Sequence, residues 1–348
     1  GKGTNFIQLD FSATPYRVQR TGQNRMKHYF VHTIVDFDLK TAIRAGLVKT
    51  IALDKRNAIW KDNPHPVFGI SELAKMPPYF GLVDAKIFHD LKFVMFLSNN
   101  DDGVALRWLW NGRYEPMSLG MWSELARQSS VIFDIGAHTG VYSIAAGFAN
   151  SKATVVACEP YDLNYARLLV NLRANGLSCD TAYPVAISDQ DGTVPFSVST
   201  GSWYLSTGGS VGVRQQGTTR SVPAMKLDTI FQQNGGNISL IKIDTEGHEL
   251  AVVRGAQNVL RACAPDILIE SVFDKVTGEI EQLLMAHGYR FYLIDDDNLE
   301  VRPVKTLAPA GTADAPAMGF LNRLITRRDP QEVQGLAETV RARLERVT

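Results

Sequence analysis

Between residues 131 and 294 the hydrophobic positions follow two alternating patterns. Short apolar runs are typical of strands buried on both faces, and the longer stretches between them have the 3.6-residue period of amphipathic helices. Pro160 and Gly176, for example, bracket one such helical stretch. Repeated strand–helix units with apolar strands predict an α/β fold with a doubly wound parallel sheet. We expect strands at 131–135, 153–159, 182–188, 194–198, 239–244, 266–270 and 290–294, and helices at 139–150, 160–175, 248–263 and 275–288.

The flanking regions have a different pattern, which suggests four segments. Residues 1–60 form a small α/β fragment, residues 61–84 a Pro-rich linker, residues 85–325 the main domain and residues 326–348 an amphipathic helix that starts at Asp329 and Pro330. In the fragment we expect strands at 6–12 and 29–39 and a helix from residue 40. In the main domain we expect strands at 92–98 and 104–110, then a helix at 116–128.

Composition and charge exclude several classes of protein. Of the 348 residues 45% are hydrophobic and 21% are charged, which is enough for a full core, and no apolar run approaches the roughly 18–20 residues of a membrane span. No secretory signal is apparent, and the three cysteines have no metal-site spacing, so we expect a cytoplasmic protein. Residues 1–61 hold 11 basic and 4 acidic side chains, and the rest of the chain has an excess of acids, which argues against a nucleic-acid partner.

The loop after the first main strand, "FDIGAHTG", has features of a cofactor site. Asp134 ends the strand, Gly136 and His138 fall in the turn, and Gly140 starts the next helix. Ligands of open α/β sheets bind at this edge. The glycine spacing lacks the dinucleotide pattern, and a carboxylate at Asp134 would repel a pyrophosphate, which argues against a nicotinamide oxidoreductase. It would tolerate S-adenosylmethionine, whose carboxylate the helix N-terminus can hold.

Two further acids are expected to contact the same cofactor. Glu159 ends the second strand, 19 residues after Gly140, at a spacing suited to binding ribose hydroxyls. Asp189 ends the third strand, where an adenine amino group would lie. Gly136 and Gly140 alone are also compatible with a simple tight turn, and Asp189–Gly192 with a hairpin turn. Asp134 and Glu159 in register favour cofactor binding.

The segment "IKIDTEGHE" concentrates ionisable groups at the end of the fourth strand. Lys242, Asp244, Glu246 and His248 fall within seven residues at the ligand edge of the sheet, which is typical of a functional site, although a solvated strand end remains the alternative. For methyl transfer to a hydroxyl, His248 is the first candidate for general base because its pKa suits neutral pH. Asp244 or Glu246 would orient it or the acceptor. Two carboxylates so spaced are a weak metal signal, and we expect none.

Several of these segments together resemble the FkbM-type methyltransferases. "VIFDIGAHTGVYS", "ACEPYDLNYARLLVNLRANG", "VAISDQDG", "MKLDTIF", "LIKIDTEGHELAVVRGA" and "ILIE" follow that family's order over about residues 90–300, and "LWNGRYEP" is similar to its stretch ahead of the core. The resemblance implies a Rossmann-like class I fold and an S-adenosylmethionine-dependent methyltransferase, usually acting on a hydroxyl oxygen. One departure is His138, where the family more often has Asn.

Residues 1–60 resemble a different family. "NFIQLDFSATPY" and "HTIVDFDLKTAIRAGLVKT" are similar to the region around the Ser-Ala-Thr motif of superfamily 2 helicases, closest to type III restriction-enzyme subunits. The ATP-binding motifs of that family are missing here, so we expect no ATPase. The resulting hypothesis is O-methylation of a small-molecule or saccharide hydroxyl. The alternatives are a nucleic-acid-associated methyltransferase and a non-catalytic cofactor-binding module, and the oligomeric state is left open.

Overall fold

In a computed structural model of the chain, the described residues are 17–21, 24–28, 68–73, 75–198, 210–211, 218–270, 277–307 and 321–346. The chain divides into two compact units, residues 1–53 and residues 54–348. In the first unit, β1 (Arg17–Thr21) and β2 (Asn24–His28) form an antiparallel hairpin that the sequence pattern did not predict. The strands expected at 6–12 and 29–39, and the helix expected from residue 40, lie outside the described residues.

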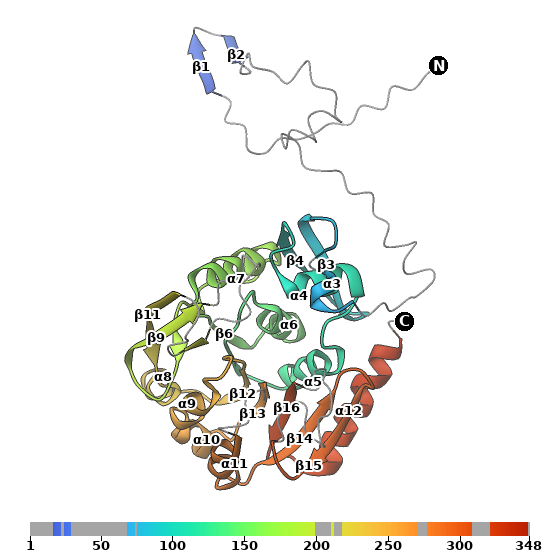
Figure 1. Ribbon diagram of the computed structural model, residues 1–348, viewed down its shortest axis with the longest axis vertical. Coiled ribbons are helices and arrows are strands. Elements are labelled where there is room, and N and C mark those ends of the chain that lie inside the picture. The colour runs from blue at the N-terminus through green and yellow to red at the C-terminus, as the bar shows by residue number, and fades with distance from the viewer. Residues whose placement is uncertain are drawn as a thin grey trace. The chain divides into compact units, whose positions relative to one another are not determined.

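The second unit is built on an eight-stranded sheet (Figure 1) with the strand order β15-β14-β16-β13-β12-β5-β6-β7. Its five strands from β13 to β7 are parallel, as predicted, but β16 runs antiparallel to both of its neighbours, and β15 is antiparallel to β14. The sheet is therefore mixed, and the expectation of a wholly parallel sheet was wrong at this edge. The short turn between β14 and β15 allows only an antiparallel pair. The strands are β5 (Val131–Ile135), β6 (Thr154–Cys158), β7 (Ala182–Tyr183), β12 (Ile238–Ile243), β13 (Asp266–Glu270), β14 (Arg290–Asp295), β15 (Glu300–Val304) and β16 (Asn322–Thr326).

Helices cover both faces of this sheet, because successive strand residues point to opposite sides. Ile132 belongs to one hydrophobic cluster and Phe133 to the other. On one face lie α5 (Pro116–Arg127), α6 (Val141–Ala149), α7 (Asp162–Ala174) and α12 (Pro330–Glu345), and on the other lie α8 (Leu227–Asn234), α9 (Glu249–Arg254), α10 (Gln257–Ala262) and α11 (Thr277–Met285). This confirms the Rossmann-like, doubly wound α/β fold. None of the described helices is long and apolar enough to cross a membrane.

One predicted strand is a helix. Residues 104–110 lie within α4 (Gly103–Asn111). The Asp102 carboxylate caps this helix by accepting hydrogen bonds from the backbone N–H groups of Val104 and Ala105, and Gly112 ends it in the left-handed conformation at φ 69°. The run is apolar on nearly all sides because α4 is almost completely buried, and an apolar run of that length does not distinguish a strand from a buried helix.

The described end of the expected linker packs into the domain. It contains α3 (Ile70–Leu73) and the first part of β3 (Phe80–Phe88), which pairs with β4 (Leu91–Ser98). Leu73 and Val83 are almost completely buried in the same hydrophobic cluster as α5 and α6. Within residues 68–84, Leu73 and Val83 therefore contribute to the core.

The predicted helix at 248–263 is broken at Gly255 into α9 and α10. A Cβ atom at Gly255 would overlap the backbone carbonyl oxygen of Ser188, and the Asp228 carboxylate accepts hydrogen bonds from two N–H groups in the first turn of α10. The predicted strand at 182–188 is also interrupted, at Pro184, which has no N–H to donate. Its second part is β8 (Ala186–Ile187), which belongs to a separate four-stranded sheet. The other strands of that sheet are β9 (Gly192–Val198), β10 (Ser210–Val211) and β11 (Thr218–Met225).

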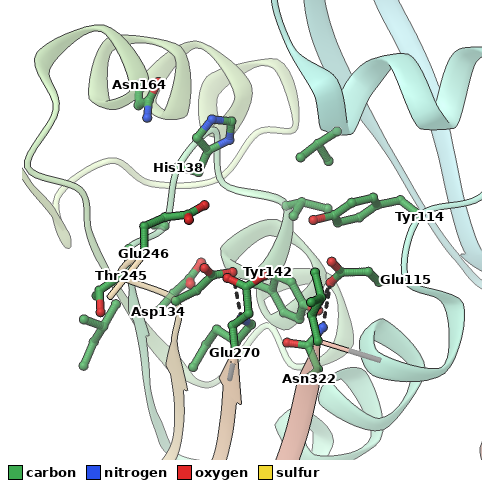
Figure 2. A pocket seen from close by; sticks show the side chains of 18 of the residues that line it. Tyr114, Glu115, Asp134, His138, Tyr142, Asn164, Thr245, Glu246, Glu270 and Asn322 are labelled. Atoms are coloured by element: carbon green, nitrogen blue, oxygen red, sulfur yellow. Dashed lines mark hydrogen bonds and ion pairs between the residues drawn. The ribbon is translucent and has the colours of Figure 1, made fainter. Parts of the chain in front are cut away.

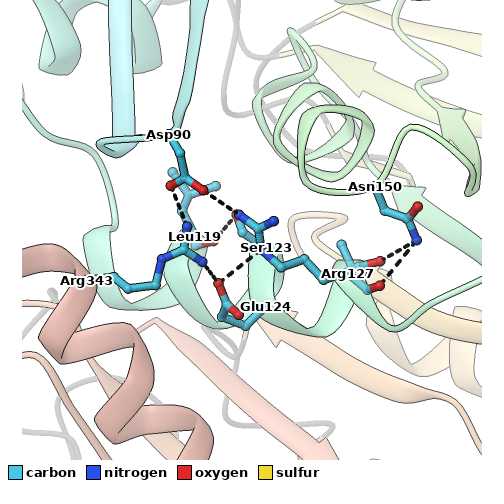
Figure 3. Close-up of polar contacts among 8 residues, drawn as sticks. Asp90, Leu119, Ser123, Glu124, Arg127, Asn150 and Arg343 are labelled. Carbon is cyan, nitrogen blue, oxygen red and sulfur yellow. Dashed lines mark hydrogen bonds and ion pairs between the residues drawn. The ribbon is translucent and has the colours of Figure 1, made fainter.

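The C-terminal helix forms as predicted and is part of the domain. Asp329 caps α12, and Glu332 completes a reciprocal capping box. Near the other end of this helix, Arg343 forms ion pairs with Asp90 in the β3–β4 turn and with Glu124 on α5 (Figure 3). Arg127 contacts the same two acids. This ion-pair network joins three segments that are distant in sequence.

Candidate active site

A pocket of about 680 Å³ lies at the carboxyl ends of β5, β6, β12 and β13. This is the edge at which open α/β sheets bind ligands, and the volume is in the range of small-molecule sites. Figure 2 shows Tyr114, Glu115 and Asn322 on one side of the pocket and His138 and Asn164 on the other. The pocket is therefore lined by groups from several distant parts of the chain.

Asp134 lies at the base of this pocket, one residue before the end of β5. Its side chain is 1% exposed and accepts a hydrogen bond of 2.6 Å from the Ser143 hydroxyl. Lys242 is its neighbour across the β5–β12 pair. Burial raises the pKa of Asp134 to about 6, although the Ser143 hydrogen bond and Lys242 partly offset this.

The turn after β5 brings two loops together. Gly136 has φ 79°, and a Cβ atom there would overlap the backbone carbonyl oxygen of Asp244, so a side chain at this position would separate the ends of β5 and β12. Gly140, at φ 95°, packs against Leu168 instead and does not line the pocket. His138 lines the pocket in the left-handed region at φ 49°. Asn and His adopt this conformation more readily than most residues, which fits the family's preference at this position.

Glu159 is the second buried carboxyl group of the pocket. It is 4% exposed and accepts hydrogen bonds of 2.8 Å from the backbone N–H groups of His138 and Tyr161. Burial raises its pKa to about 8, and these backbone hydrogen bonds only partly oppose that effect. The carboxyl group thus links the loop after β5 to the loop after β6 and lines the pocket.

Lys242, Asp244 and Glu270 form a compact charged cluster at the ends of β12 and β13. The Lys242 ammonium is 2.9 Å from the Asp244 carboxylate, and its side chain is almost completely buried. Burial would lower the pKa of Lys242, but Asp244 and Glu270 outweigh it and raise the pKa. Burial alone would raise the pKa of Asp244, but Lys242 and a hydrogen bond with Glu270 lower it. Burial and the facing Asp244 raise the pKa of Glu270 well above its usual value. Of the two carboxyl groups, Asp244 therefore favours the ionised form and Glu270 the protonated form.

The remaining predicted site residues divide into two groups. Glu246 lines the pocket, with φ 54°. His248 and Asp189 are not among the lining residues. The His248 Nε2 atom is 2.9 Å from the Ser188 hydroxyl, and burial lowers its pKa. Asp189 is exposed. The structure thus brings Asp134, Gly136, His138, Glu159, Lys242, Asp244 and Glu246 together and leaves His248, Asp189 and Gly140 outside the lining.

Sequence reasoning missed a second polar group on the opposite side of the pocket. The Glu115 carboxylate accepts hydrogen bonds from the Tyr142 hydroxyl at 2.5 Å and from the Asn322 amide at 3.1 Å. Tyr114 and Glu270 also line the pocket. Glu270 is the last residue of the apolar strand β13 at the ligand edge, and the same pattern that identified Asp134 could have identified it as a site residue. Asn322 opens the antiparallel strand β16, and no sequence pattern pointed to it.

Asp244, Glu246 and Glu270 offer oxygens that lie within 4.8 Å of one another, a separation that a metal ion can bridge. However, the Lys242 ammonium already contacts Asp244 and neutralises part of this charge. That no metal is used stays a prediction.

Comparisons with known proteins find similarity to methyltransferases. Residues 134–291 match the model of the Methyltransferase FkbM domain. The chain is 29% identical over 144 residues to the hexuronic acid methyltransferase AglP of Haloferax volcanii, a match that covers 40% of this chain and 55% of that protein. The chain thus spans about half the length of this curated relative.

Two solved structures are similar as well. An FkbM methyltransferase from Methylobacillus flagellatus is 14% identical, with a TM-score of 0.37 and coverage of 63% of this chain and 52% of that chain. An S-adenosylmethionine-dependent methyltransferase from Agrobacterium tumefaciens is 11% identical, with a TM-score of 0.40 and coverage of 78% and 80%. The domain match does not extend to residues 1–60, where the helicase-like resemblance stays a prediction. Residues 134–291, which hold most of the pocket's charged groups, are the part of the chain that matches the methyltransferase FkbM domain model.

Proposed function

We propose that this protein is an S-adenosylmethionine-dependent methyltransferase that methylates a hydroxyl group of a saccharide. The observation that carries the proposal is the location of Asp134, Glu159 and Asp244 in one pocket, at the ligand edge of an FkbM-type domain. The name of the relative from Haloferax volcanii, a hexuronic acid methyltransferase, supports a sugar acceptor.

The lining residues fit the cofactor, which supplies an electrophilic methyl group when bound. Glu159 provides buried carboxyl oxygens suited to ribose hydroxyls, and Asp134 provides a carboxyl group suited to an ammonium. Ile187 and Phe196 form an apolar wall suited to an adenine ring. A pyrophosphate would be repelled by an ionised Asp134 carboxylate, which disfavours a nicotinamide dinucleotide.

The residues of the charged cluster are suited to accept the hydroxyl proton. Lys242, 2.9 Å away, lowers the pKa of Asp244, whereas burial and Asp244 raise the pKa of Glu270, so Asp244 is the member of the pair that favours the ionised form and can accept a proton. His248 does not line the pocket. We therefore assign the proton-accepting role to Asp244 in place of His248, with Lys242 and Glu270 positioning it. Glu246, which lines the pocket beside Asp244, remains a candidate for orienting the acceptor hydroxyl.

Cofactor binding can be tested by thermal shift with S-adenosylmethionine, S-adenosylhomocysteine and NAD. We expect the two methionine-derived ligands to raise the melting midpoint and NAD to leave it unchanged. Asp134→Ala should abolish the shift, whereas a shift with NAD alone would exclude the cofactor assignment.

Catalysis can be tested by following methyl transfer from radiolabelled S-adenosylmethionine to a panel of saccharides. We expect Asp244→Asn to lower turnover at least 100-fold, a loss typical of an essential proton acceptor. His248→Ala is the matched control and should stay within twofold of the wild type. Equal losses in both variants would contradict the assignment of Asp244.

Two other functions are separated by the same measurements. A nucleic-acid-associated methyltransferase predicts methyl transfer to RNA or DNA and none to the saccharides, although the acidic lining of the pocket disfavours a phosphate backbone. A non-catalytic cofactor-binding module predicts a thermal shift with no methyl transfer to any acceptor.

A further inference from the structure

The side of the pocket opposite the cofactor residues is built by other parts of the chain. Tyr114 and Glu115 come from the segment between α4 and α5, and Asp296 and Asn322 come from the chain after residue 291. All four lie outside the residues that match the FkbM domain model. This part of the pocket is therefore built by the segments that flank the matched domain, and it faces the residues assigned to the cofactor.

Glu115 lines the pocket and has a strained backbone conformation. It precedes α5 with φ 39°, in the left-handed region, and its side chain does not cap the helix. The carboxylate accepts hydrogen bonds from Tyr142 and Asn322 instead. A non-glycine residue in this conformation must be compensated by its surroundings, and such residues concentrate at functional sites.

Asn322 has an unsatisfied oxygen in the same place. Its side chain is only 2% exposed and lines the pocket. The Glu115 carboxylate can only accept hydrogen bonds, so the Asn322 amide nitrogen must face it and the carbonyl oxygen Oδ1 must face elsewhere. Among the residues that the structure describes, none donates a hydrogen bond to this buried oxygen. Buried polar atoms are nearly always paired, so the donor that is missing here is expected from a ligand.

We propose that Asn322 and Glu115 form a hydroxyl-binding subsite for the methyl acceptor, in which a sugar hydroxyl donates a hydrogen bond to Asn322 Oδ1. The proposal rests on the proposed function, because it concerns the acceptor of the same reaction. The Glu115 carboxylate lies beside this oxygen and can accept from a neighbouring hydroxyl, so the pair suits the adjacent hydroxyls of a sugar ring. Tyr114 adds an aromatic side chain beside them (Figure 2).

The subsite has no direct contact with the two acids that are assigned to the cofactor. Asn322 contacts Glu115, and Glu115 contacts Tyr142. Neither residue has a hydrogen bond with Asp134 or Glu159 among the described contacts. Removing the Asn322 amide should therefore weaken acceptor binding and leave cofactor binding intact.

The test is isothermal calorimetry with methyl pyranosides of glucose, galactose and mannose and the corresponding uronic acids, on protein saturated with S-adenosylhomocysteine. Asn322→Leu keeps the size of the side chain and removes the amide. We expect it to weaken the tightest-binding sugar at least tenfold while S-adenosylhomocysteine affinity stays within twofold. Asn298→Leu, which removes an exposed amide that donates to Asp295, is the matched control and should bind as the wild type does.

A second variant, Glu115→Gln, should also weaken the same sugar without changing S-adenosylhomocysteine affinity, and its folding is checked by that affinity. The subsite is excluded if both variants bind the sugar as tightly as the wild type, or if no sugar of the panel binds a wild-type protein that binds S-adenosylhomocysteine normally. If the wild type does not bind S-adenosylhomocysteine at all, the proposed function fails instead.

Discussion

Glu159 should couple cofactor binding to the release of a proton. The carboxyl group is 4% exposed, and burial raises its pKa to about 8, so at pH 7 roughly nine-tenths of the protein carries a neutral Glu159. Ribose hydroxyls donate hydrogen bonds most strongly to the ionised form. Binding should therefore expel up to roughly 0.9 proton at pH 7 and almost none at pH 9.

The same coupling sets the pH dependence of affinity. Below pH 8 the cofactor must bind the minor, ionised form, so this group contributes an increase in affinity approaching tenfold per pH unit between about pH 6 and 8. Glu159→Gln removes the titration and puts an amide N–H₂ opposite one of the two backbone N–H groups that now donate to the carboxyl oxygens. Loss of hydrogen bonds to a charged group costs about 1.5–3 kcal/mol, or roughly 10–150-fold in affinity.

The assay is calorimetry of S-adenosylhomocysteine binding at pH 7 in phosphate and in Tris, because the difference in measured enthalpy between buffers counts the protons released. Asp162→Asn is the matched control, since that carboxylate is exposed and pairs with Arg220 on the surface. We expect the control to release as many protons as the wild type, and Glu159→Gln to release fewer. An equal proton count in the wild type and Glu159→Gln would refute the coupling.

Three further predictions concern stability. Without cofactor, the melting midpoint of the wild type should fall relative to that of Glu159→Gln as pH rises from about 4 to 8, because folded Glu159 holds a proton with a pKa of about 8 that the unfolded chain releases near pH 4; a difference between the two midpoints that does not change with pH would contradict it. In urea titrations, Gly136→Ala should lose more than about 2 kcal/mol because its Cβ would overlap backbone, whereas the control Gly335→Ala, in open space within α12, should gain about 0.5–1 kcal/mol. Arg343→Met should lose about 1 kcal/mol at low salt and less in 1 M NaCl, because its ion pairs are partly exposed; a loss unchanged by salt would point to packing on Phe88 instead.

The central sheet could be predicted from the sequence because its strands are bounded apolar runs. β5 and β13 lie where the pattern put them. The pattern failed at α4, where burial on nearly all sides removes the polar face that identifies a helix, and only Asp102 and Gly112 mark its ends. It also failed at Gly255, where the break depends on a contact with Ser188, 67 residues earlier in the chain.

The candidate site was predictable where a residue ends a parallel strand. Asp134, Glu159 and Asp244 all follow apolar runs, and the topology of an open sheet brings such positions to one edge. His248 was favoured for its ordinary pKa, but it is the N-cap residue that precedes α9, and its ring contacts the Ser188 hydroxyl outside the pocket. Asn322 was not predictable, because β16 reaches the pocket only through its antiparallel insertion between β13 and β14.

Strained backbone conformations occur at three residues of this pocket. Of the seven non-glycine residues with positive φ among the described residues, three line the pocket: Glu115, His138 and Glu246. Each costs on the order of 1 kcal/mol or more. At His138 the strained backbone directs an N–H group to Glu159, and at Glu115 it leaves the carboxylate free of the helix end and available to Asn322. Strained residues thus position one group on each side of the pocket: His138 on the cofactor side and Glu115 on the opposite side. This is expected if both sides must be rigid before ligands bind.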